Sequence, residues 1–382
     1  MTPLPLPSGA VRALAFFTAL TSACAAGGSG GANVRIYYVA AENVDWDFAP
    51  SGTNQITGAP FSQIDSLIFL PQREAIGRVY RKAIYREYTD STFTTPKPRA
   101  PEWEHLGILG PLLRAVVGDT IRVVFRNNAD RPYSMHPHGV FYNKDSEGAP
   151  YADGSGDANG KDDRVPPGGT HLYVWPVPER AGPAHGEVSS VVWMYHSHTH
   201  EEQDVNAGLI GPMVVTAAGM ARPDGSPTDV DREFVVAFLE MDENVSWYFE
   251  HNVTTYAKEP ARVPRFVNFA DLHYITNLRE SLNGFSLGHL KGLTMKVGDR
   301  VRWYVFANAN FEMHAPHWHG NTVVANHMRT DVLSLTTMEM VTAEMVPDNP
   351  GTWLFHCHVA PHQLAGMLAT FTVQPRDSAA GR

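Results

Sequence analysis

The chain carries short apolar and aromatic runs separated by turns rich in glycine and proline, and it shows no long run of helical periodicity. Runs in which apolar and polar positions alternate, bounded by turn residues, are typical of half-buried strands. Nine runs fit this pattern, at residues 120–127, 171–177, 191–198, 213–217, 234–239, 300–306, 338–346, 353–358 and 368–373. Their spacing predicts an all-β protein built from Greek-key β-sandwiches.

The two halves of the chain repeat one order of events. In each half a Gly-Asp step, at Gly118 and again at Gly298, opens a strand that is followed by a His-x-His-Gly motif. An internal duplication of this kind predicts one β-sandwich per copy. A length of 382 residues also suits two domains. We expect domain 1 at residues 33–219, a polar turn-forming linker at 220–231, and domain 2 at 232–376.

The first 32 residues differ from the rest. Arg12 precedes an apolar run at residues 13–20, followed by small residues and a Gly/Ser-rich leader, as in a secretory signal peptide. We therefore expect export to the periplasm or the extracellular space. The run is too short to cross a bilayer, so no transmembrane helix is predicted. Cys24 lies where a lipoprotein carries its acylated cysteine, and lipid anchoring and ordinary cleavage nearby both stay open.

Charge and cysteine content narrow the function. The formal net charge is −10 and no basic stripe exists to neutralise phosphates, which argues against a nucleic-acid partner. Beyond the leader the chain holds a single cysteine, Cys357, so an intrachain disulfide framework is excluded. A lone thiol in an oxidising compartment needs protection, and metal ligation supplies it.

Ten of the 18 histidines gather in four short clusters. A single histidine is more often a core or surface residue than a ligand, but clustered pairs that recur in both halves predict metal binding. Because side chains alternate along a strand, each His-x-His pair presents two imidazoles on one face. The clusters are His136/His138, His196/His198, His314/His317/His319 and His356/His358/His362.

The same alternation separates Cys357 from its neighbours His356 and His358, so its sulfur faces a second site. Cys357 with His314, His362 and Met367 supplies a thiolate, two imidazoles and a thioether, which is typical of a blue-copper electron-transfer site. A structural zinc site would not use the thioether and would leave eight histidines without a role. Those eight suit a cluster of three coppers.

These motifs resemble those of multicopper oxidases over residues 34–374. Residues 104–111 and 131–139 are similar to ceruloplasmin-like cupredoxin domains, as are residues 85–90 and 241–248. The resemblance implies four coppers: a type 2 ion on His136 and His317, one type 3 ion on His138, His196 and His358, the other on His198, His319 and His356, and a type 1 ion on Cys357, His314, His362 and axial Met367.

The first half departs from a complete type 1 site. Tyr133 stands where His314 stands and Ser197 where Cys357 stands, so domain 1 is expected to hold no blue copper. The chain thus resembles small two-domain laccases. That resemblance implies a homotrimer in which each cluster lies between domain 1 of one subunit and domain 2 of its neighbour.

The resemblance also implies the reaction. Small reductants, phenols or aromatic amines, would give single electrons to the type 1 copper, and Cys357 with His356 and His358 would pass them to the cluster that reduces dioxygen to water. The alternative is a ferroxidase or cuprous oxidase. Ceruloplasmin-like ferroxidases carry an acidic residue where this chain has Pro361, which argues against iron as the reductant. Glu280 and Glu312 lie near the type 1 motif and could still bind a cation or orient a phenol, with an exposed loop carboxylate as the alternative for each.

Two further alternatives are weaker. A non-catalytic cupredoxin scaffold predicts decayed copper ligands, whereas all ten histidines, the cysteine and the methionine are present. A copper nitrite reductase would have its type 1 site in domain 1 and would lack the paired His-x-His set. The methionines Met338, Met340 and Met345 alternate with other residues and look like a strand face rather than a cuprous-ion site.

Acidic residues suggest two accessory roles. Glu201, Glu202 and Asp204 follow His198 and are candidates for proton transfer, with a solvated loop as the alternative. A Gly-broken acidic loop resembles the calcium site of ceruloplasmin's first domain, and calcium and a solvated loop both stay open. The residues of this loop are Lys144, Asp145, Glu147, Gly148, Asp153, Asp157, Asp162 and Asp163.

Overall fold

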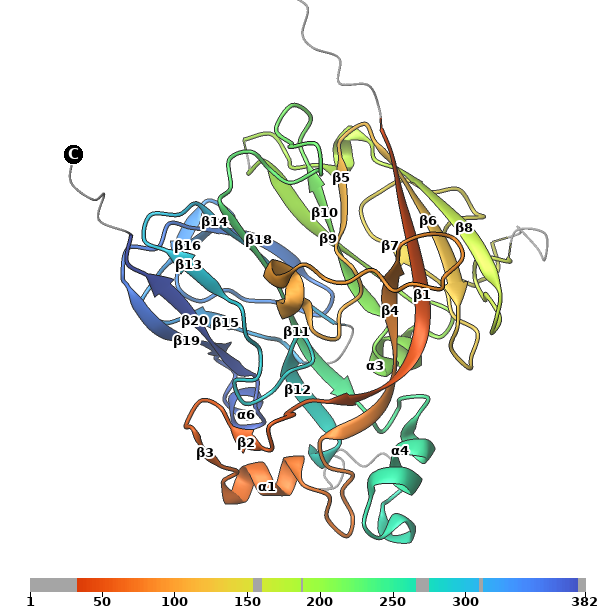
Figure 1. Cartoon of the computed structure of the whole chain (residues 1–382), viewed down its shortest axis with the longest axis vertical. Coiled ribbons are helices and arrows are strands. Elements are labelled where there is room, and N and C mark those ends of the chain that lie inside the picture. The colour runs from red at the N-terminus through yellow and green to blue at the C-terminus, as the bar shows by residue number, and fades with distance from the viewer. Residues whose placement is uncertain (1–32, 154–159, 187, 266–274, 309–311, 377–382) are drawn as a thin grey trace, which may run out of the picture. The chain divides into compact units, whose positions relative to one another are not determined.

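A computed structural model describes residues 33–153, 160–186, 188–265, 275–308 and 312–376. The predicted signal peptide and leader, including Cys24, lie outside the described residues, as does Asp157. Within the described ranges, no helix has the length and apolar character needed to cross a membrane. The fold is all-β, as the alternation of apolar and polar positions predicts (Figure 1).

The first half of the chain forms two four-stranded sheets. One has the order β4-β1-β6-β8, with β1 at Val34–Asp47, β4 at Val79–Tyr88, β6 at Thr120–Asn127 and β8 at Thr170–Pro176. The other has the order β5-β10-β9-β7, with β5 at Leu113–Val116, β7 at His136–Pro137, β9 at Ser190–His196 and β10 at Ile210–Thr216. Their inner faces enclose one apolar cluster that includes Phe125, Trp175 and Tyr195.

The second half repeats this plan. Its six-stranded sheet has the order β12-β11-β14-β18-β16-β17, with β11 at Arg232–Asp242, β12 at Leu278–Leu282, β14 at Val301–Ala307, β16 at Val323–Ala325, β17 at Met328–Thr330 and β18 at Met340–Met345. Its four-stranded sheet has the order β13-β20-β19-β15, with β13 at Thr294–Lys296, β15 at Pro316–Trp318, β19 at Gly351–Cys357 and β20 at Leu368–Gln374.

Strand pairing shows the duplication in detail. In each half the first long strand pairs in parallel with the third and antiparallel with the second, as β1 does with β6 and β4, and β11 with β14 and β12. The second sheets match as well, because β10 and β20 each join one parallel and one antiparallel neighbour. This shared connectivity supports the two-sandwich prediction drawn from the repeated motifs.

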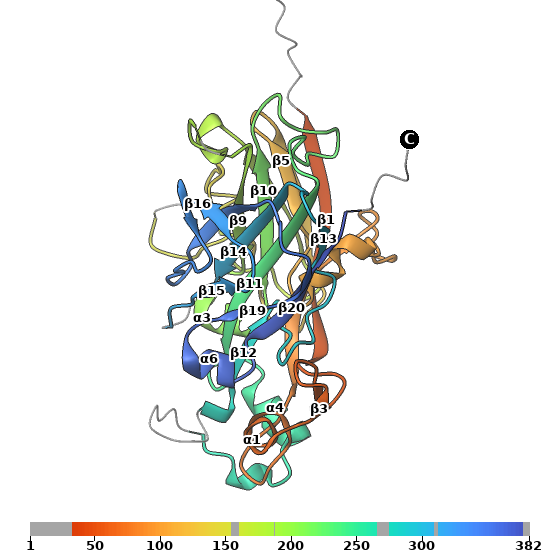
Figure 2. The ribbon, with the colours of Figure 1, turned by 90° about the vertical axis from the view of Figure 1, so that its left-hand side faces the viewer.

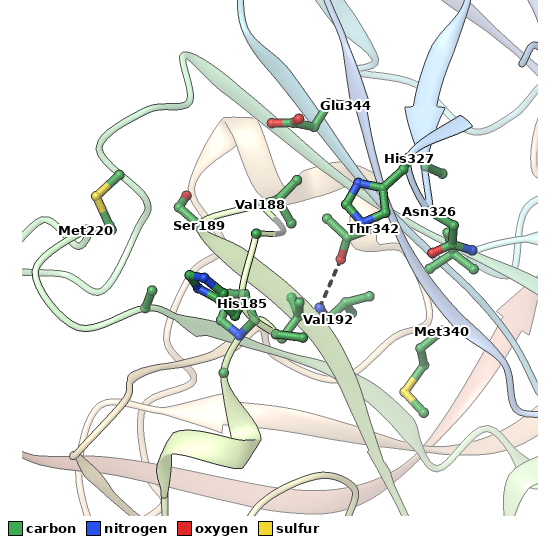
Figure 3. Close-up of a pocket in the computed structure, with 18 of the residues that line it drawn as sticks. His185, Val188, Ser189, Val192, Met220, Asn326, His327, Met340, Thr342 and Glu344 are labelled. Carbon is green, nitrogen blue, oxygen red and sulfur yellow. Dashed lines mark hydrogen bonds between the residues drawn. The ribbon is translucent and has the colours of Figure 1, made fainter. Parts of the chain in front are cut away.

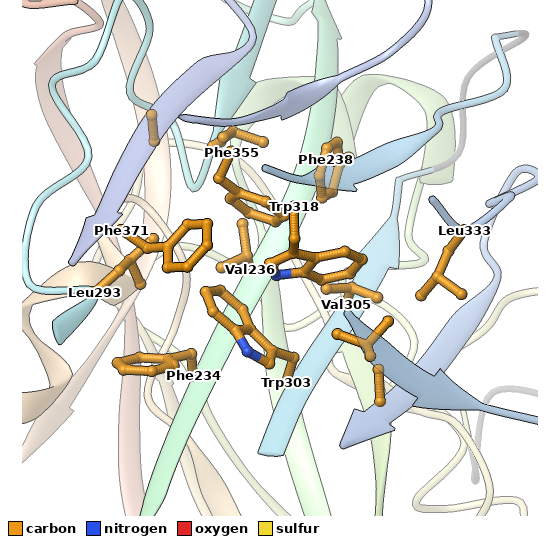
Figure 4. Close-up of a cluster of buried hydrophobic side chains, with 14 of the residues drawn as sticks. Phe234, Val236, Phe238, Leu293, Trp303, Val305, Trp318, Leu333, Phe355 and Phe371 are labelled. Atoms are coloured by element: carbon orange, nitrogen blue, oxygen red, sulfur yellow. The ribbon is translucent and has the colours of Figure 1, made fainter. Parts of the chain in front are cut away.

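Aromatic side chains fill the second sandwich. Trp303, Trp318 and Phe355 are fully buried, and their ring centroids lie 5.0–5.6 Å apart (Figure 4). Aromatic pairs at this separation add about 0.5–1.5 kcal/mol each beyond the area that they bury. Trp318 belongs to β15 and Phe355 to β19, so this packing joins the two strands that carry His317 and His356.

A third apolar cluster joins the halves. It combines residues of β9 and β10 with residues of β11 and β14, among them Met194, Val214, Val235 and Phe306. Polar contacts cross the same boundary, as where the Ser190 and Tyr304 hydroxyls lie 2.7 Å apart. The two sandwiches accordingly belong to one compact unit, and the domain limits at 219 and 232 stay a prediction.

The helices are short. Those that lie wholly within the described residues are α1 at Gln63–Phe69, α3 at Glu201–Ala207, α4 at Phe249–Tyr256 and α6 at Ala360–Leu364, with 3-10 turns η1 at Pro101–Leu106, η2 at Glu179–Ala181 and η3 at Pro260–Arg262. Residues 48–78, between β1 and β4, contain α1 and the small hairpin of β2 at Thr53–Asn54 and β3 at Ala59–Pro60. We call residues 48–78 the strap. Its first helix is fixed by a capping box in which Ser62 and Asp65 bond each other's backbone N–H groups.

Candidate metal centres

Strand register brings the paired histidines together in each half. His136 of β7 is the direct partner of His196 in β9, and His317 of β15 is the direct partner of His356 in β19. Cross-strand partners place their side chains about 4.5–5.5 Å apart on one face. His138, His198, His319 and His358 follow closely after the ends of these strands, and their rings lie beside those of the paired histidines.

The first set, His136, His138, His196 and His198, forms a compact group of imidazoles. The Nε2 atoms of His138 and His196 are 3.1 Å apart. The ring centroid of His136 lies 5.2–5.6 Å from those of the other three. We call this group the first histidine quartet. Its four side chains converge as the His-x-His motifs predict.

The second histidine quartet, His317, His319, His356 and His358, has the same arrangement. The Nε2 atom of His356 lies 3.0 Å from His319 Nε2 and 3.2 Å from His317 Nδ1. One ring nitrogen from each of these three residues falls within 4.8 Å of the other two, the geometry of a shared metal ion. His358 completes the group, with its ring 5.1 Å from that of His317.

Backbone carbonyls fix the tautomers in both quartets. The Nδ1–H of His356 donates to the carbonyl of the next residue, Cys357, at 2.7 Å, and His196 does the same to Ser197 at 3.1 Å. His136 Nδ1 lies 2.7 Å from the Glu147 carbonyl. A ring that donates through Nδ1 presents a lone pair on Nε2, and metal-binding histidines are held in this way. The chain's own backbone therefore orients the donors.

Burial keeps the rings neutral. Desolvation lowers the pKa of His138 to about 4, and it also lowers the pKa values of His136, His196, His317 and His356. In each of the five, the ring of a neighbouring histidine lowers the pKa further. Neutral imidazoles are the form that binds metal, so the quartets fit copper ions.

The two quartets stay separate within one chain. Among the described residues, every hydrogen bond and ring contact of a quartet histidine to another histidine joins members of the same quartet. A cluster that needs all eight rings is thus divided into two half-sites. The predicted assignment of type 2 and type 3 coppers to mixed sets of ligands stays a prediction.

The second centre surrounds the buried thiol of Cys357. Its Sγ atom lies 3.5 Å from His362 Nδ1 and 3.9 Å from His314 Nδ1, and the two Nδ1 atoms are 3.2 Å apart. The backbone N–H of Ala315 donates to the sulfur at 3.3 Å. Met367 is fully buried, and its carbonyl accepts from the N–H of Cys357 at 3.1 Å. These four residues lie together as predicted.

The chemistry of this centre fits copper. Burial raises the pKa of the Cys357 thiol, so the thiolate forms when a metal ion displaces the proton. Desolvation lowers the pKa of His314 to about 3, with the neighbouring His362 as the second cause. A thiolate with two neutral imidazoles in an apolar shell is the donor set of a blue-copper centre.

The corresponding place in the first half is filled by protein groups. Ser197 donates to the Asp204 carboxylate at 2.7 Å and accepts from the N–H of Ser134 at 3.0 Å. The Tyr133 hydroxyl lies 2.9 Å from that of Tyr248. Trp247 donates to the other Asp204 oxygen at 2.8 Å. This hydrogen-bonded network supports the expectation that the first half holds no type 1 copper.

A cluster of carboxylates lies against the cysteine centre. Glu240 of β11 is the direct cross-strand partner of Glu280 in β12, and both are buried within 4.8 Å of a ring nitrogen of His362. Glu312 is 56% exposed and places an oxygen 3.7 Å from His362 Nε2. Glu280 and Glu312 are near the type 1 motif in the sequence, whereas only the pairing of β11 with β12 reveals Glu240. We call these three residues the acidic cluster.

The acidic cluster is electrostatically costly. Burial raises the pKa of Glu240 to about 7 and raises that of Glu280 well above its ordinary value, with the Glu240 charge as the second cause for Glu280. One oxygen of Glu280 is buried without a hydrogen-bond partner. Two ionised carboxylates this close would repel each other, so without a cation the pair is expected to keep a proton between them. A cation between the two carboxylates would offset the cost.

Other predicted acidic residues divide in the structure. Glu201 lies 3.2 Å from His198 Nε2 and 4.0 Å from His196 Nε2, so it can exchange protons beside the first quartet. Asp204 is occupied by its hydrogen bonds, and Glu202 is exposed. The three methionines do not share a strand face: Met345 is buried in the second sandwich, Met340 packs against the third apolar cluster from the other side of β18, and Met338 lies in the turn before that strand.

The acidic loop gathers several carboxylates. Asp162 accepts from the N–H of Gly148 at 2.7 Å, while its other oxygen is buried without a partner. Burial raises the pKa of Asp163 to about 6, with Asp162 the next cause. Lys144 pairs with Asp153 at 3.2 Å and with Glu147. Calcium binding at this loop stays a prediction.

A cavity of about 920 Å³ lies away from these groups. It is lined by His185 and Met220 from the first half and by His327 and Met340 from the second (Figure 3). The N–H of Val192 donates to the Thr342 hydroxyl across its floor at 3.3 Å. None of the twelve predicted copper ligands lines the cavity, so it is not the metal site.

Paired sandwiches with converging imidazole and thiolate donors define a copper protein of the cupredoxin type. Two family models, both described as multicopper oxidase, match residues 106–219 and 260–377. The chain therefore belongs to the multicopper oxidase family, as its motifs predict. Solved structures agree in fold: a multicopper oxidase aligns at a TM-score of 0.56 and the blue copper oxidase of Nitrosomonas europaea at 0.55, both at 18% identity. The first alignment covers 89% of each chain, and the second covers 90% of this chain and 86% of the other.

Curated relatives are longer proteins. The chain is 43% identical to the ferroxidase HEPHL1 of Mus musculus, 40% to hephaestin and 39% to ceruloplasmin of Homo sapiens, with 90–91% of this chain aligned. It spans only 29–31% of the length of these relatives.

Proposed function

We propose that this protein is a metallo-oxidase, which takes single electrons from a reduced metal ion, ferrous iron above all, and uses them to reduce dioxygen to water. The acidic cluster beside His362 carries this proposal. Relatives at 40–43% identity include one named as a ferroxidase, which supports the same conclusion. The acidic cluster and these relatives support the metal-ion alternative more than the laccase-like hypothesis, which rested on Pro361 and on the resemblance to two-domain laccases.

The acidic cluster has the chemistry of a cation site. Glu240 and Glu280 supply hard oxygen donors, which suit ferrous iron and other divalent ions. The exposed Glu312 extends the negative charge from the buried pair to the surface. A ferrous ion would thus meet the exposed Glu312 first and the buried Glu240 and Glu280 next. The three glutamates of the acidic cluster would take the place of the acidic residue that ferroxidases carry at the position of Pro361.

Other reductants fit less well. A cuprous ion prefers thioethers, whereas Met338, Met340 and Met345 are used in packing. A phenol donates only one O–H, so a pair of buried carboxylates suits a divalent cation better. Phenol oxidation stays a prediction that the same experiment tests.

His362 links the acidic cluster to the thiol. Its Nδ1 faces Cys357 and its Nε2 faces Glu312, so one imidazole joins the two sites. When bound, copper supplies the one-electron steps and the binding of dioxygen. The chain's own part is to fix donors through backbone carbonyls, to exclude water from Cys357, and to connect Cys357 covalently to His356 and His358.

Glu280→Gln and Glu240→Gln should lower kcat/KM for ferrous iron by roughly 10- to 100-fold, because each removes a charge and a donor from the entry site. Oxidation of a phenol should stay near its wild-type rate. Oxygen uptake measured with ferrous iron, cuprous ion and a phenol side by side tests this. Glu250→Gln, which changes a side chain that is 67% exposed in α4, is the matched control.

Two results would count against the proposal. A wild-type protein that oxidises phenols more efficiently than ferrous iron would favour the laccase-like hypothesis. Equal losses with iron and phenol in Glu280→Gln would mean that the variant damages the cysteine centre itself.

We further propose that the two histidine quartets meet between subunits of a homotrimer. The separation of the quartets within one chain supports this, because each half-site supplies only four of the eight imidazoles. In a closed ring, every subunit would offer its first quartet to one neighbour and its second quartet to the other.

Mixing two inactive variants tests the assembly. His138→Ala breaks the first quartet and His319→Ala breaks the second, so each variant alone should lose oxygen reduction. Co-expressed in equal amounts, they should recover about a quarter of wild-type activity, since random mixing leaves about one interface in four with both quartets intact. The check is oxygen uptake by the mixed protein, with copper content measured alongside. No recovery in an assembly shown to be mixed would mean that each cluster forms within one chain.

A further inference from the structure

The strap leaves the first sandwich and reaches the second. It begins after β1, forms β2, β3 and α1, and returns as β4. Figure 1 shows β2 and α1 below α6, the helix that carries His362, and Figure 2 shows α1 at the same end of the molecule as α6. A segment of the first half therefore lies next to the cysteine centre of the second half.

Backbone hydrogen bonds tie the strap to the loop at residues 285–288. The N–H of Ser286 donates to the carbonyl of Phe48 at 2.8 Å. The N–H of Gln55 donates to the carbonyl of Leu287 at 2.9 Å. These bonds hold the loop from the strap side at two points.

The same loop holds the segment that carries the predicted axial ligand. The N–H of Leu287 donates to the carbonyl of Gly366 at 2.8 Å, and the N–H of Gly288 donates to the carbonyl of Leu368 at 2.9 Å. Met367 lies between these two anchored carbonyls. The strap is thus hydrogen-bonded to the loop at residues 285–288, and this loop is hydrogen-bonded to the segment that carries Met367.

Phe69, the last residue of α1, makes a direct side-chain contact with the ligand segment. It is 1% exposed, and its ring packs on Gly366. A Cβ atom at Gly366 would lie 3.0 Å from Phe69 Cζ and 3.0 Å from Ser286 Cβ, and the φ angle of Gly366 is +106°. Only glycine tolerates both constraints. The backbone before Met367 therefore leaves no room for a side chain beside the ring.

Arg279 extends the contact to the acidic cluster. Its guanidinium lies 5.4 Å from the centre of the Phe69 ring and donates to the carbonyls of Ile68 at 3.0 Å and Gly77 at 3.3 Å. Arg279 directly precedes Glu280 in β12. The end of α1 thus contacts the segment that carries Met367 and also the residue that precedes Glu280 of the acidic cluster.

We propose that Phe69 is a positioning residue for the cysteine centre, which holds the Gly366-Met367 segment in place and so sets the reduction potential of the copper bound there. Axial-ligand position and the apolar shell tune such potentials. Phe69 touches neither substrate nor the ligating atoms and acts through Gly366. This inference rests on the proposed assignment of Cys357, His314, His362 and Met367 as the type 1 ligands.

The test compares copper-loaded variants by absorption spectrum, electron paramagnetic resonance and redox titration. Phe69→Ala should shift the visible band and the reduction potential, because the cavity that it leaves lets the Met367 segment relax. Leu67→Ala, on the exposed face of α1, should shift neither. Phe125→Ala removes an equally buried ring from the first sandwich and should destabilise the protein while leaving both signals unchanged. Phe69→Leu, with a milder loss of volume, serves if the alanine variant fails to fold.

Two outcomes separate this inference from the proposed function. A wild-type protein without a blue band that depends on Cys357 would overturn the type 1 assignment itself. A normal band in the wild type that stays unmoved in both Phe69 variants would leave the assignment standing and overturn the positioning role alone.

Discussion

Cys357→Ser should abolish the blue colour of the copper-loaded protein and lower turnover with every reductant by more than about 100-fold. In the proposed type 1 centre the sulfur is the donor that gives the blue colour, and the backbone of Cys357 joins it to His356 and His358 of the second quartet. Losing even a hydrogen-bond partner of a ligand costs about 10- to 100-fold in metal affinity or activity, so losing the ligand costs more. Visible absorption and oxygen uptake measure the two effects.

The fold should survive this change. Serine is slightly smaller than cysteine, and Ser197 already occupies the equivalent strand position in the first half. Circular dichroism should match the wild type, and copper content should fall by about one ion per chain, as expected when the proposed type 1 site loses its thiolate. Retained turnover in the absence of blue colour would contradict the proposed electron path.

Lys82→Met should destabilise the protein by about 3–5 kcal/mol, because it leaves Glu243 buried without a positive partner. Both side chains are fully buried, and the ammonium of Lys82 contacts the Glu243 carboxylate and donates to the carbonyl of Asn206 at 2.6 Å. Burial lowers the pKa of Lys82 and raises that of Glu243 to about 7. The pair joins β4 of the first half to the end of β11 in the second, so urea unfolding should report its loss.

A surface pair provides the comparison. Arg300 and Asp231 form an ion pair at 2.8 Å with side chains that are 53% and 40% exposed. Arg300→Ala should cost only about 0–1 kcal/mol. If Lys82→Met proved equally mild, Glu243 would be taking up a proton, and the pair would not be the anchor between the halves.

Much of the fold was predictable from local patterns. All nine apolar runs correspond to strands, and the run at 120–127 coincides with β6. β1 and β4 escaped notice, since Val34–Asp47 mixes charged and apolar residues along its length. That strand pairs on both sides, with β4 and β6, so hydrogen bonding rather than alternation defines it. The strap was missed as well, because no periodicity marks a segment whose contacts are distant in sequence.

The members of the candidate site were predictable where the metal-binding side chains belong to one short motif. The quartets and the cysteine centre follow from the His-x-His and His-Cys-His spacing, and the structure brings their members within contact distance. Glu240 was not predictable in this way. It becomes a neighbour of His362 only through its register with Glu280, and a single sequence does not specify which residues of β11 and β12 stand opposite each other.

The hydrogen-bonded network around Ser197 also shows what it would take to engineer a second electron entry into this protein. Replacing Tyr133 by histidine and Ser197 by cysteine would restore two donors, yet the Asp204 carboxylate would then face a thiolate and raise its pKa. Asp204 would have to be replaced by an apolar residue. Trp247 would then need a new acceptor for its indole N–H. A designer would therefore have to change the support of the site together with its ligands.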